Sequence, residues 1–390
     1  MSRPDPARVA AVSAAAAAMA PTVIDWTQRI AAIPAPTGDE AERAAFVCTL
    51  MRGMGLDPVE DDIHDVVGRI PGRAGADGPA VLLAAHLDTV FVRETPLPIT
   101  ASGGRLFGPG IGDNSVGVAA VLAVPEILRA AGQHPAADVL LTGNVGEEGL
   151  GNLRGIRAVM DANPRTAAVV AVEGHNLGRV THIAVGSRRL RITATGPGGH
   201  SWGDFGRPSA LHALARLIAD LDAIPLAWSP KTTLNVGIVE GGISVNSIAP
   251  TASCLLDMRS IDADALARLG ERVDRAIDGA RRNGISIVAE VIGERPAGQV
   301  PLQSPAVKTV AAVLGALGVE ASYDASSTDA NIALSRGVPA VCIGLTTGGN
   351  VHREDEYIDT EPIALGLAQL ALLSLELSDQ AAAGTLAARA

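Results

Sequence analysis

The chain has 390 residues, a length that favours two or three domains, and its 47% share of hydrophobic residues is ample for globular cores. Only nine residues are Phe, Trp or Tyr, so Ala, Val, Leu and Ile must fill these cores. The formal net charge of −11, without a long run of Lys or Arg, argues against a nucleic-acid partner, because binding a phosphate backbone requires a dense basic patch.

Cysteine usage and the N-terminal segment bear on the compartment. The sequence contains three widely spaced cysteines, Cys48, Cys254 and Cys342. They indicate neither a disulfide framework nor a cysteine-rich zinc site, and a reducing cytoplasm fits them. The alanine-rich segment 14–20 is similar to a signal-peptide core, but Asp5 and Arg8 precede it and Pro21 interrupts it, so we expect no export. No apolar run reaches the roughly eighteen residues that span a bilayer, and we expect no membrane partner.

Between residue 80 and about residue 185, strand-like apolar runs alternate with helical patterns. The predicted elements are a strand over 81–85, a helix over 116–131, a strand over 139–142, a helix near 153–161 and a strand over 167–172. Strands separated by helices predict an α/β fold with a mostly parallel central sheet and helices on both faces. In such sheets, ligands bind beyond the carboxyl ends of the strands.

From residue 188 the pattern changes. It predicts a strand (190–195), a helix (208–221), two strands (233–239 and 253–259), a helix (263–282) and a strand (285–291). This βαββαβ order is typical of a ferredoxin-like domain with a four-stranded antiparallel sheet. A helix over 306–317 and an apolar run over 338–345 then resume the first pattern. We therefore expect a catalytic domain in two parts, 1–186 and 299–390, interrupted by an inserted domain at 187–298.

The strand over 81–85 ends by presenting His86 and Asp88. Side chains two residues apart on a strand point to the same face, so Asp88 can accept one imidazole N–H of His86 while the other ring nitrogen binds a metal. A surface hydrogen bond is the plainer interpretation of this pair alone.

Four more motifs place a His or a carboxylate beside a glycine-rich turn that follows an apolar run. They contribute Asp113, the pair Glu147 and Glu148, Glu173, and His352. Two histidines and three ligating carboxylates suit zinc, cobalt or manganese. Five ligands are too many for one catalytic zinc, and they predict two metal ions that share a bridging carboxylate, with a water between the metals.

The adjacent acids Glu147 and Glu148 can divide the work. Glu148 binds a metal, while Glu147 remains unligated and takes a proton from the metal-bridging water. Metal coordination lowers the pKa of such a water toward about 7, and the base then turns it into a nucleophile for an amide carbonyl. A solvated acidic turn is the alternative interpretation.

With these motifs, the chain resembles the co-catalytic zinc peptidases that include carboxypeptidase G, succinyl-diaminopimelate desuccinylase, acetylornithine deacetylase, aminoacylase and peptidase T. The resemblance covers about residues 20–375 and all five ligand motifs in order. It implies that Asp113 bridges two metals, Asp88 orients His86, and Glu147 is the general base. The ligands that it implies are His86, Asp113, Glu148, Glu173 and His352. It also implies a cis peptide after Asp113.

The resemblance extends to the inserted domain, which matches the family's lid and dimerisation domain. It implies that His200, in Gly196-Pro-Gly-Gly-His200-Ser201, reaches the active site of the neighbouring subunit of a homodimer and stabilises an oxyanion there. Asn246 and Arg259 match positions that bind a substrate carboxylate. Gly348 and Gly349 would let backbone amides approach the substrate.

Two features bear on the substrate. Asn-Ser-Val follows Asp113, where many relatives have an acidic residue or methionine, then lysine and paired glycines, so the resemblance does not define the pocket floor. Relatives acting as carboxypeptidases or deacylases usually have Glu at the position of Glu173, whereas aminopeptidases usually have Asp. We therefore expect a hydrolase for small N-acyl amino acids or short peptides with a free carboxylate.

Three alternatives stay open. The first is a di- or tripeptide aminopeptidase of the peptidase T type, which must recognise a free α-amine. The second is a binding protein stabilised by metal, which has no need of a proton-transfer base. The third is a dinucleotide loop at Gly108-Pro-Gly-Ile-Gly, whose spacing is incomplete and whose following Asp would repel a pyrophosphate.

Overall fold

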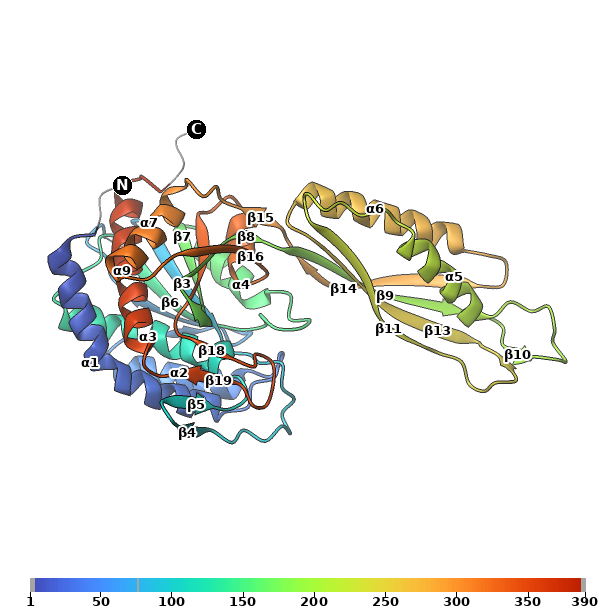
Figure 1. The fold of residues 1–390 in the computed structure, drawn as a ribbon, viewed down its shortest axis with the longest axis horizontal. Helices are drawn as coiled ribbons and strands as arrows, with labels where there is room; N and C mark the ends of the chain where they lie inside the picture. The colour runs from blue at the N-terminus through green and yellow to red at the C-terminus, as the bar shows by residue number, and fades with distance from the viewer. Residues whose placement is uncertain (1–3, 76, 387–390) are drawn as a thin grey trace. The chain divides into compact units, whose positions relative to one another are not determined.

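The computed structural model describes residues 4–75 and 77–386, and Figure 1 labels most of its elements. The chain divides into two compact units. Unit 1 combines Met1–Ala184 with Gln299–Ala390, and unit 2, Val185–Gly298, is inserted between the two parts. Unit 1 therefore completes its core only after the chain returns from unit 2.

A nine-stranded, mainly parallel sheet forms the centre of unit 1. Its strands are β1 (Val59–Glu60), β2 (Val66–Ile70), β3 (Ala80–His86), β6 (Asp138–Asn144), β7 (Thr166–Leu177), β8 (Arg179–Ala184), β15 (Gly298–Gln299), β16 (Ser322–Ser326) and β17 (Ala340–Gly344). The order is β1-β2-β6-β3-β7-β17-β8-β15, and β16 pairs with β8. The four central strands β6, β3, β7 and β17 are parallel to one another. The predicted α/β fold with a mostly parallel sheet is confirmed.

Helices cover both faces of this sheet. They are α1 (Pro6–Ala31), α2 (Ala41–Gly53), α3 (Val116–Ala130), α4 (Arg154–Ala162), α7 (Pro305–Ala316), α8 (Ala330–Ser335) and α9 (Ile363–Ala382). Alternate residues of β3 enter different cores. Val81 and Leu83 join the core that contains α1, α3 and α9, whereas Leu82 and Ala84 join the core that contains α4 and α8. All of β3 is buried, which explains its uninterrupted apolar run.

Two smaller features of unit 1 lie next to the site described below. The first is an antiparallel sheet with the order β18-β19-β5-β4. Its strands are β4 (Thr100–Ser102), β5 (Arg105–Phe107), β18 (Gly348–Gly349) and β19 (Tyr357–Asp359). The second is a π-helical turn, η1 (Ile111–Ser115), which leads directly into α3. The sequence predicted neither feature, because two- and three-residue strands are too short to show a period.

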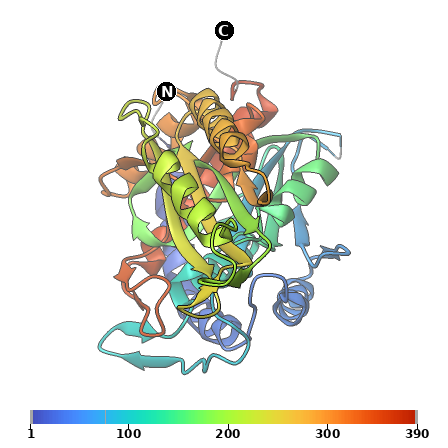
Figure 2. The ribbon, with the colours of Figure 1, turned by 90° about the vertical axis from the view of Figure 1, so that its right-hand side faces the viewer.

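Unit 2 is built on a four-stranded antiparallel sheet. Its helices lie on one side of this sheet, as Figure 2 shows. Its main elements follow the chain order β9 (Gly186–Thr195), α5 (Ala210–Asp222), β11 (Thr232–Gly241), β13 (Thr251–Ser260), α6 (Ala263–Ala280) and β14 (Ser286–Arg295). The short strands β10 (Gly199–His200) and β12 (Ser247–Ile248) pair with each other. Apolar side chains of α5, α6 and the four long strands form one separate core.

Helix α1 differs from the expectation for the N-terminal segment. It continues through Pro21, where the sequence predicted an interruption. Packing against α3 and α9 buries Val12, Ala16 and Val23, and this tertiary burial outweighs the roughly 3 kcal/mol that a proline costs inside a helix.

Two helices bear on the expectation about membrane-spanning segments. Two helical segments, Pro6–Ala31 and Ile111–Ala130, are long and apolar enough to span a bilayer by length and composition. Most of Ile111–Ala130 is buried inside the protein, so it has the character of a core helix.

Two helical glycines give a test of the packing around α9. A Cβ on Gly366 would lie 2.0 Å from the carbonyl oxygen of Leu345, so Gly366→Ala should lower the free energy of unfolding by about 1–3 kcal/mol. Gly315 in α7 is the matched control, since no heavy atom of the described residues lies within 4 Å of its Cβ position. Gly315→Ala should raise stability by about 0.4–1 kcal/mol. Urea unfolding measures both, and a stabilised Gly366→Ala variant would contradict this close approach.

Candidate metal centre

The five predicted metal ligands lie together in unit 1. His86 ends β3, Glu173 lies in β7, Glu148 follows the end of β6, and Asp113 lies in η1. Because β6, β3 and β7 are parallel neighbours, their carboxyl ends meet at one edge of the sheet. His352 joins them from the loop between β18 and β19.

Asp113 contributes to two groups of potential ligands. Its Oδ1 lies 3.0 Å from His86 Nε2, and its Oδ2 lies 3.0 Å from His352 Nε2. Glu173 completes the first group, with Oε2 3.8 Å from His86 Nε2. Glu148 completes the second, with Oε1 3.1 Å from His352 Nε2. The ligand atoms of each group lie within 4.8 Å of one another, which is the arrangement of two adjacent cation sites that share one carboxylate.

The donor set fits a pair of divalent metal ions. His86 is buried, and its Nε2 makes no well-aligned hydrogen bond with a described residue, although Asp113 Oδ1 lies 3.0 Å away. A metal ion would satisfy both the ring nitrogen and the carboxylate. Imidazole nitrogens combined with carboxylate oxygens suit zinc, cobalt or manganese.

In the structure, His86 Nδ1 faces both the backbone carbonyl and the carboxylate of Asp88. His86 Nδ1 lies 3.0 Å from the backbone carbonyl of Asp88 and 3.6 Å from its Oδ1, so the carbonyl is the closer partner. The reason is that β3 ends at His86, so the strand geometry that would align the two side chains does not extend to Asp88. The Asp88 carboxylate instead accepts the N–H groups of Glu147 and Glu148 and the hydroxyl of Thr37. It therefore supports the turn that bears both glutamates.

Without metal, the charges of the cluster compensate one another. Burial opposes the charge on His86, but the surrounding carboxylates, Asp113 foremost, outweigh burial and raise its pKa well above the ordinary value. Hydrogen bonds with Asp113 and Glu148 raise the pKa of His352 to about 10. Although burial opposes it, these two histidines hold the pKa of Asp113 below its ordinary value. Both histidines are therefore protonated at neutral pH in the metal-free protein.

Glu147 lies beside the ligands, and it is almost fully buried. One of its carboxylate oxygens is within 4.8 Å of ligand atoms of His86 and Glu148. It is next to Glu148 in the chain and next to both ligand groups in space, where a carboxylate could accept a proton. His86, Glu147 and Glu148 also form a third group of potential ligands.

A buried glutamate that the sequence analysis missed holds the turn that carries Asp113. The Glu356 carboxylate accepts N–H groups from Gly110, Gly112 and Asp113 and lies 2.7 Å from His175 Nε2. The only sequence signal was its position four residues after His352 in the same short loop.

Asn114, the first residue after Asp113, where the sequence departs from many relatives, has a structural role. Its peptide bond with Asp113 is cis, as the resemblance implies. Its side chain is fully buried, and Nδ2 donates to the carbonyl of Val172, 2.6 Å away. Asn114 therefore links η1 to β7, the strand that carries Glu173.

The glycines expected beside the substrate have packing reasons of their own. A Cβ on Gly348 would lie 2.2 Å from the carbonyl oxygen of Tyr357 and 2.8 Å from His175 Nδ1. A Cβ on Gly349 would lie 3.1 Å from the Tyr357 hydroxyl. Close packing thus requires glycine at 348 whether or not a substrate approaches.

The other predicted substrate contacts belong to unit 2 and are not part of the cluster in unit 1. They are His200, Asn246 and Arg259. Arg259 lies on β13, and its Nε donates to Asp257 Oδ2 over 2.8 Å. Asn246 precedes β12, and its Oδ1 accepts the hydroxyl of Ser244.

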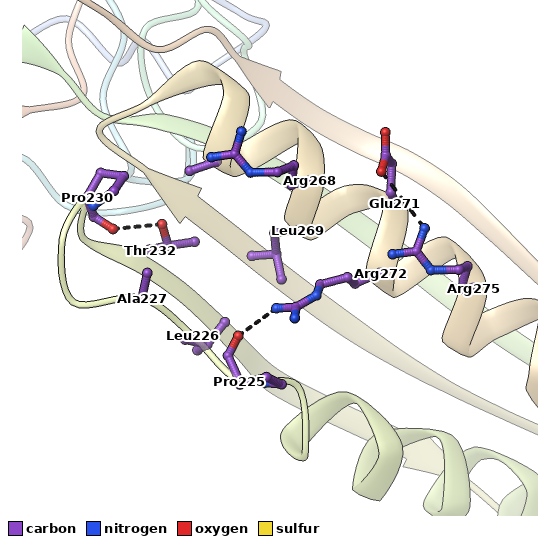
Figure 3. Close-up of a pocket in the computed structure, with 11 residues that line it drawn as sticks. Pro225, Leu226, Ala227, Pro230, Thr232, Arg268, Leu269, Glu271, Arg272 and Arg275 are labelled. Atoms are coloured by element: carbon purple, nitrogen blue, oxygen red, sulfur yellow. Dashed lines mark hydrogen bonds and ion pairs between the residues drawn. The ribbon is translucent and has the colours of Figure 1, made fainter.

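Unit 2 also contains a cavity of about 370 Å³, shown in Figure 3. It lies between α6 and the segment 225–232. Arg272 donates to the carbonyl oxygen of Pro225 over 2.7 Å, and Arg275 lies 3.9 Å from Glu271. No residue that lines it belongs to the five-ligand cluster, so the cavity is separate from the candidate metal centre.

The chain is similar to several known proteins. The model of peptidase family M20/M25/M40 matches residues 82–376. The chain is 25% identical over 348 residues to succinyl-diaminopimelate desuccinylase of Corynebacterium glutamicum, an alignment that covers 86% of this chain and 92% of that protein. It is 25% identical over 386 residues to carboxypeptidase G2 of a Pseudomonas species, with 92% and 89% covered.

A solved structure shares the fold. Aminopeptidase PepT from Bacillus cereus aligns with a TM-score of 0.76 and 18% sequence identity, covering 92% of this chain and 98% of that chain. The family match extends over most of the chain and includes all five residues of the cluster. The chain belongs to peptidase family M20/M25/M40.

Proposed function

We propose that the protein is a dinuclear metal-dependent hydrolase that cleaves the amide bond of small N-acyl amino acids or short peptides with a free carboxylate. The observation that carries the proposal is the pair of ligand groups that share Asp113, with the carboxylate of Glu147 beside both. The first group is His86, Asp113 and Glu173, and the second is Asp113, Glu148 and His352. Zinc is the leading candidate for both ions, with cobalt or manganese as alternatives.

In the proposed reaction, the metal ions, Glu147 and Asp88 have different roles. Two bound metal ions would lower the pKa of a water between them and polarise the scissile carbonyl. Glu147 accepts the proton of the attacking water and delivers it to the leaving amine. Asp88 holds the backbone of Glu147 and Glu148 through two hydrogen bonds of 2.9 Å, so the base stays beside the ligands.

A free carboxylate on the substrate is favoured by three features. Glu173 occupies the fourth ligand position, Arg259 offers a guanidinium on an accessible sheet face, and Asn246 offers an exposed amide. The names of the two aligned relatives, a desuccinylase and a carboxypeptidase, fit such substrates. The alternative is a di- or tripeptide aminopeptidase, which the fold shared with aminopeptidase PepT supports. A metal-stabilised binding protein is the non-enzymatic alternative.

We also propose a homodimer whose active sites are completed by His200 of the neighbouring subunit. His200 Nδ1 accepts the N–H groups of Trp202 and Gly203 over 3.2 Å each, so the neutral ring carries its proton on Nε2. This exposed donor suits a tetrahedral oxyanion. The edge strand β11 exposes about half of Ile238 and of Val239, which supports pairing with a second copy. Three free, buried cysteines support a cytoplasmic location.

Replacing the proposed base gives the first test. Glu147→Ala should retain about two metal ions per chain and lose at least roughly a hundredfold in kcat on N-acetyl amino acids or dipeptides, because only proton transfer is removed. Metal analysis and hydrolysis of this panel measure both quantities. Glu126→Ala in α3 removes a partly exposed carboxylate that pairs with Arg129, and this control should keep full activity. One metal or none, or no turnover by the wild type after metal is supplied, would favour the binding-protein alternative.

Arg259 distinguishes substrates that carry a carboxylate. Arg259→Ala should raise KM at least roughly tenfold for these substrates, because a charge-assisted bidentate contact is lost. Arg191→Ala is the matched control, since Arg191 projects from the same sheet face, paired in register with Leu255. An unchanged KM for Arg259→Ala would remove the carboxylate role. Peptides with an amidated C-terminus and a free N-terminus then separate the alternatives, because only an aminopeptidase should cleave them.

Metal affinity should increase as the pH rises. The raised pKa values of His86 and His352 keep both rings protonated in the metal-free protein, so metal binding must displace protons. Affinity should therefore increase about tenfold per pH unit for each displaced proton between roughly pH 6 and 8. Calorimetry in buffers of different ionisation enthalpy counts the released protons. An affinity that does not change over this range would contradict the proposed ligand pair.

A further inference from the structure

The turn that follows β6 is held by an unusual set of acceptors. Four successive backbone N–H groups, from residue 145 to residue 148, each donate to a buried carboxylate. Val145 donates to Asp65 over 2.8 Å, and Gly146 donates to Glu40 over 3.2 Å. The next two N–H groups donate to the two oxygens of Asp88, over 2.9 Å each. Asp65, Glu40 and Asp88 come from three separate parts of the chain and have no more than 1% exposure.

Among these three acids, Glu40 forms a close ion pair with an arginine, Arg154. Its Oε1 and Oε2 accept Arg154 Nη2 over 2.7 and 2.8 Å, and Oε1 also accepts the N–H of Gly38. Arg154 starts α4, six residues after Glu148. The ion pair therefore connects the start of α2, the turn and the start of α4.

Residue 146 of the turn must be a glycine to leave room for this ion pair. Gly146 has φ of +67°, and a Cβ there would lie 2.5 Å from Arg154 Nη1. The carbonyl groups of the turn are also bonded, because Val145 accepts the N–H of Gly155 and Gly146 accepts the N–H of Leu153. The two peptides on either side of Gly146 are thus each hydrogen-bonded at the N–H and at the carbonyl, which fixes the backbone that leads into Glu147.

We propose that Glu40, through its ion pair with Arg154, is a positioning residue that fixes the Gly146 peptide and so holds the Glu147 carboxylate where it takes its proton. The inference rests on the proposed role of Glu147 as base. Proton transfer depends steeply on placement, and a displacement of about 1 Å can cost roughly a hundredfold in rate. Neither Glu40 nor Arg154 belongs to the five-ligand cluster, so loss of the pair should leave metal content unchanged.

Strand β6 offers a matched control at its other end. Asp138 begins β6, is nearly buried, and accepts both a backbone N–H, from Gly72 over 2.7 Å, and an arginine, Arg69 Nε over 2.8 Å. Glu40 likewise accepts a backbone N–H and an arginine, beside the turn that follows β6. Asp138→Asn and Glu40→Gln therefore remove equivalent charges, and only Glu40→Gln should affect the turn.

The experiment compares Glu40→Gln, Arg154→Met and Asp138→Asn with the wild type in the metal-loaded full chain. We expect Glu40→Gln and Arg154→Met to lower kcat about tenfold to a hundredfold with KM within about twofold, and Asp138→Asn to keep kcat. Introduced into Glu147→Asp, whose carboxylate is already displaced, Glu40→Gln should cost much less than in the wild type. Hydrogen exchange should accelerate in the peptide that contains residues 145–148 for Glu40→Gln and Arg154→Met, and not for Asp138→Asn.

The outcomes separate this inference from the proposed function. If the wild type hydrolyses no amide of the panel, the proposed function fails. Hydrogen exchange still tests the positioning contact in that case, and an unchanged exchange rate at residues 145–148 in Glu40→Gln would contradict it. If the wild type is active but Glu40→Gln keeps its kcat, or Asp138→Asn loses as much, the inference is overturned. Arg154 is one-third exposed, so we expect Arg154→Met to fold, and this variant decides the question if Glu40→Gln does not fold.

Discussion

The site depends on one constraint, the concentration of negative charge at the carboxyl ends of β6, β3 and β7. Asp113, Glu148 and Glu173 approach one another there, with Glu147 and Asp88 close behind. In the metal-free protein the charge is balanced by two histidines whose pKa values are raised. Two divalent ions would balance the same negative charge in place of the two imidazole protons. Metal binding should therefore release these protons.

The fold meets this requirement by separating the ligands from the groups that hold them. The ligands come from strand ends and loops, but their backbones are fixed by buried carboxylates from elsewhere. Glu356 holds the turn of Asp113, and Asp88 holds the turn of Glu147 and Glu148. Hydrogen bonds from N–H groups stabilise a buried carboxylate and fix the backbone at the same time. The carboxylates that bind no metal are therefore as much part of the site as those proposed to bind one.

Sequence reasoning succeeded where a local pattern carries the information. The buried strands β3, β6 and β7 read as apolar runs, and each site motif combines a glycine-rich turn with a His or an acid. It failed where the partner is distant in the chain. Helix α2 was missed because the fully buried Arg43 interrupts its apolar face, and Arg43 donates to the carbonyl groups of Ile33 and Leu87 outside the helix. Helix α9 was missed because it is buried almost all round and so lacks a period.

The same distance explains why Glu40 and Glu356 were not recognised as parts of the site. Glu40 meets Gly146 across 106 residues, and Glu356 meets Asp113 across 243. Their hydrogen bonds also bear on the reaction, because all four N–H groups from residue 145 to residue 148 are occupied by carboxylates. This turn therefore has no N–H left to donate to an oxyanion. In the proposed mechanism the oxyanion must be stabilised by metal and by a donor from outside the turn. His200, with its proton on an exposed Nε2, has the chemistry for that task, which gives the inserted unit a reason to belong to the enzyme.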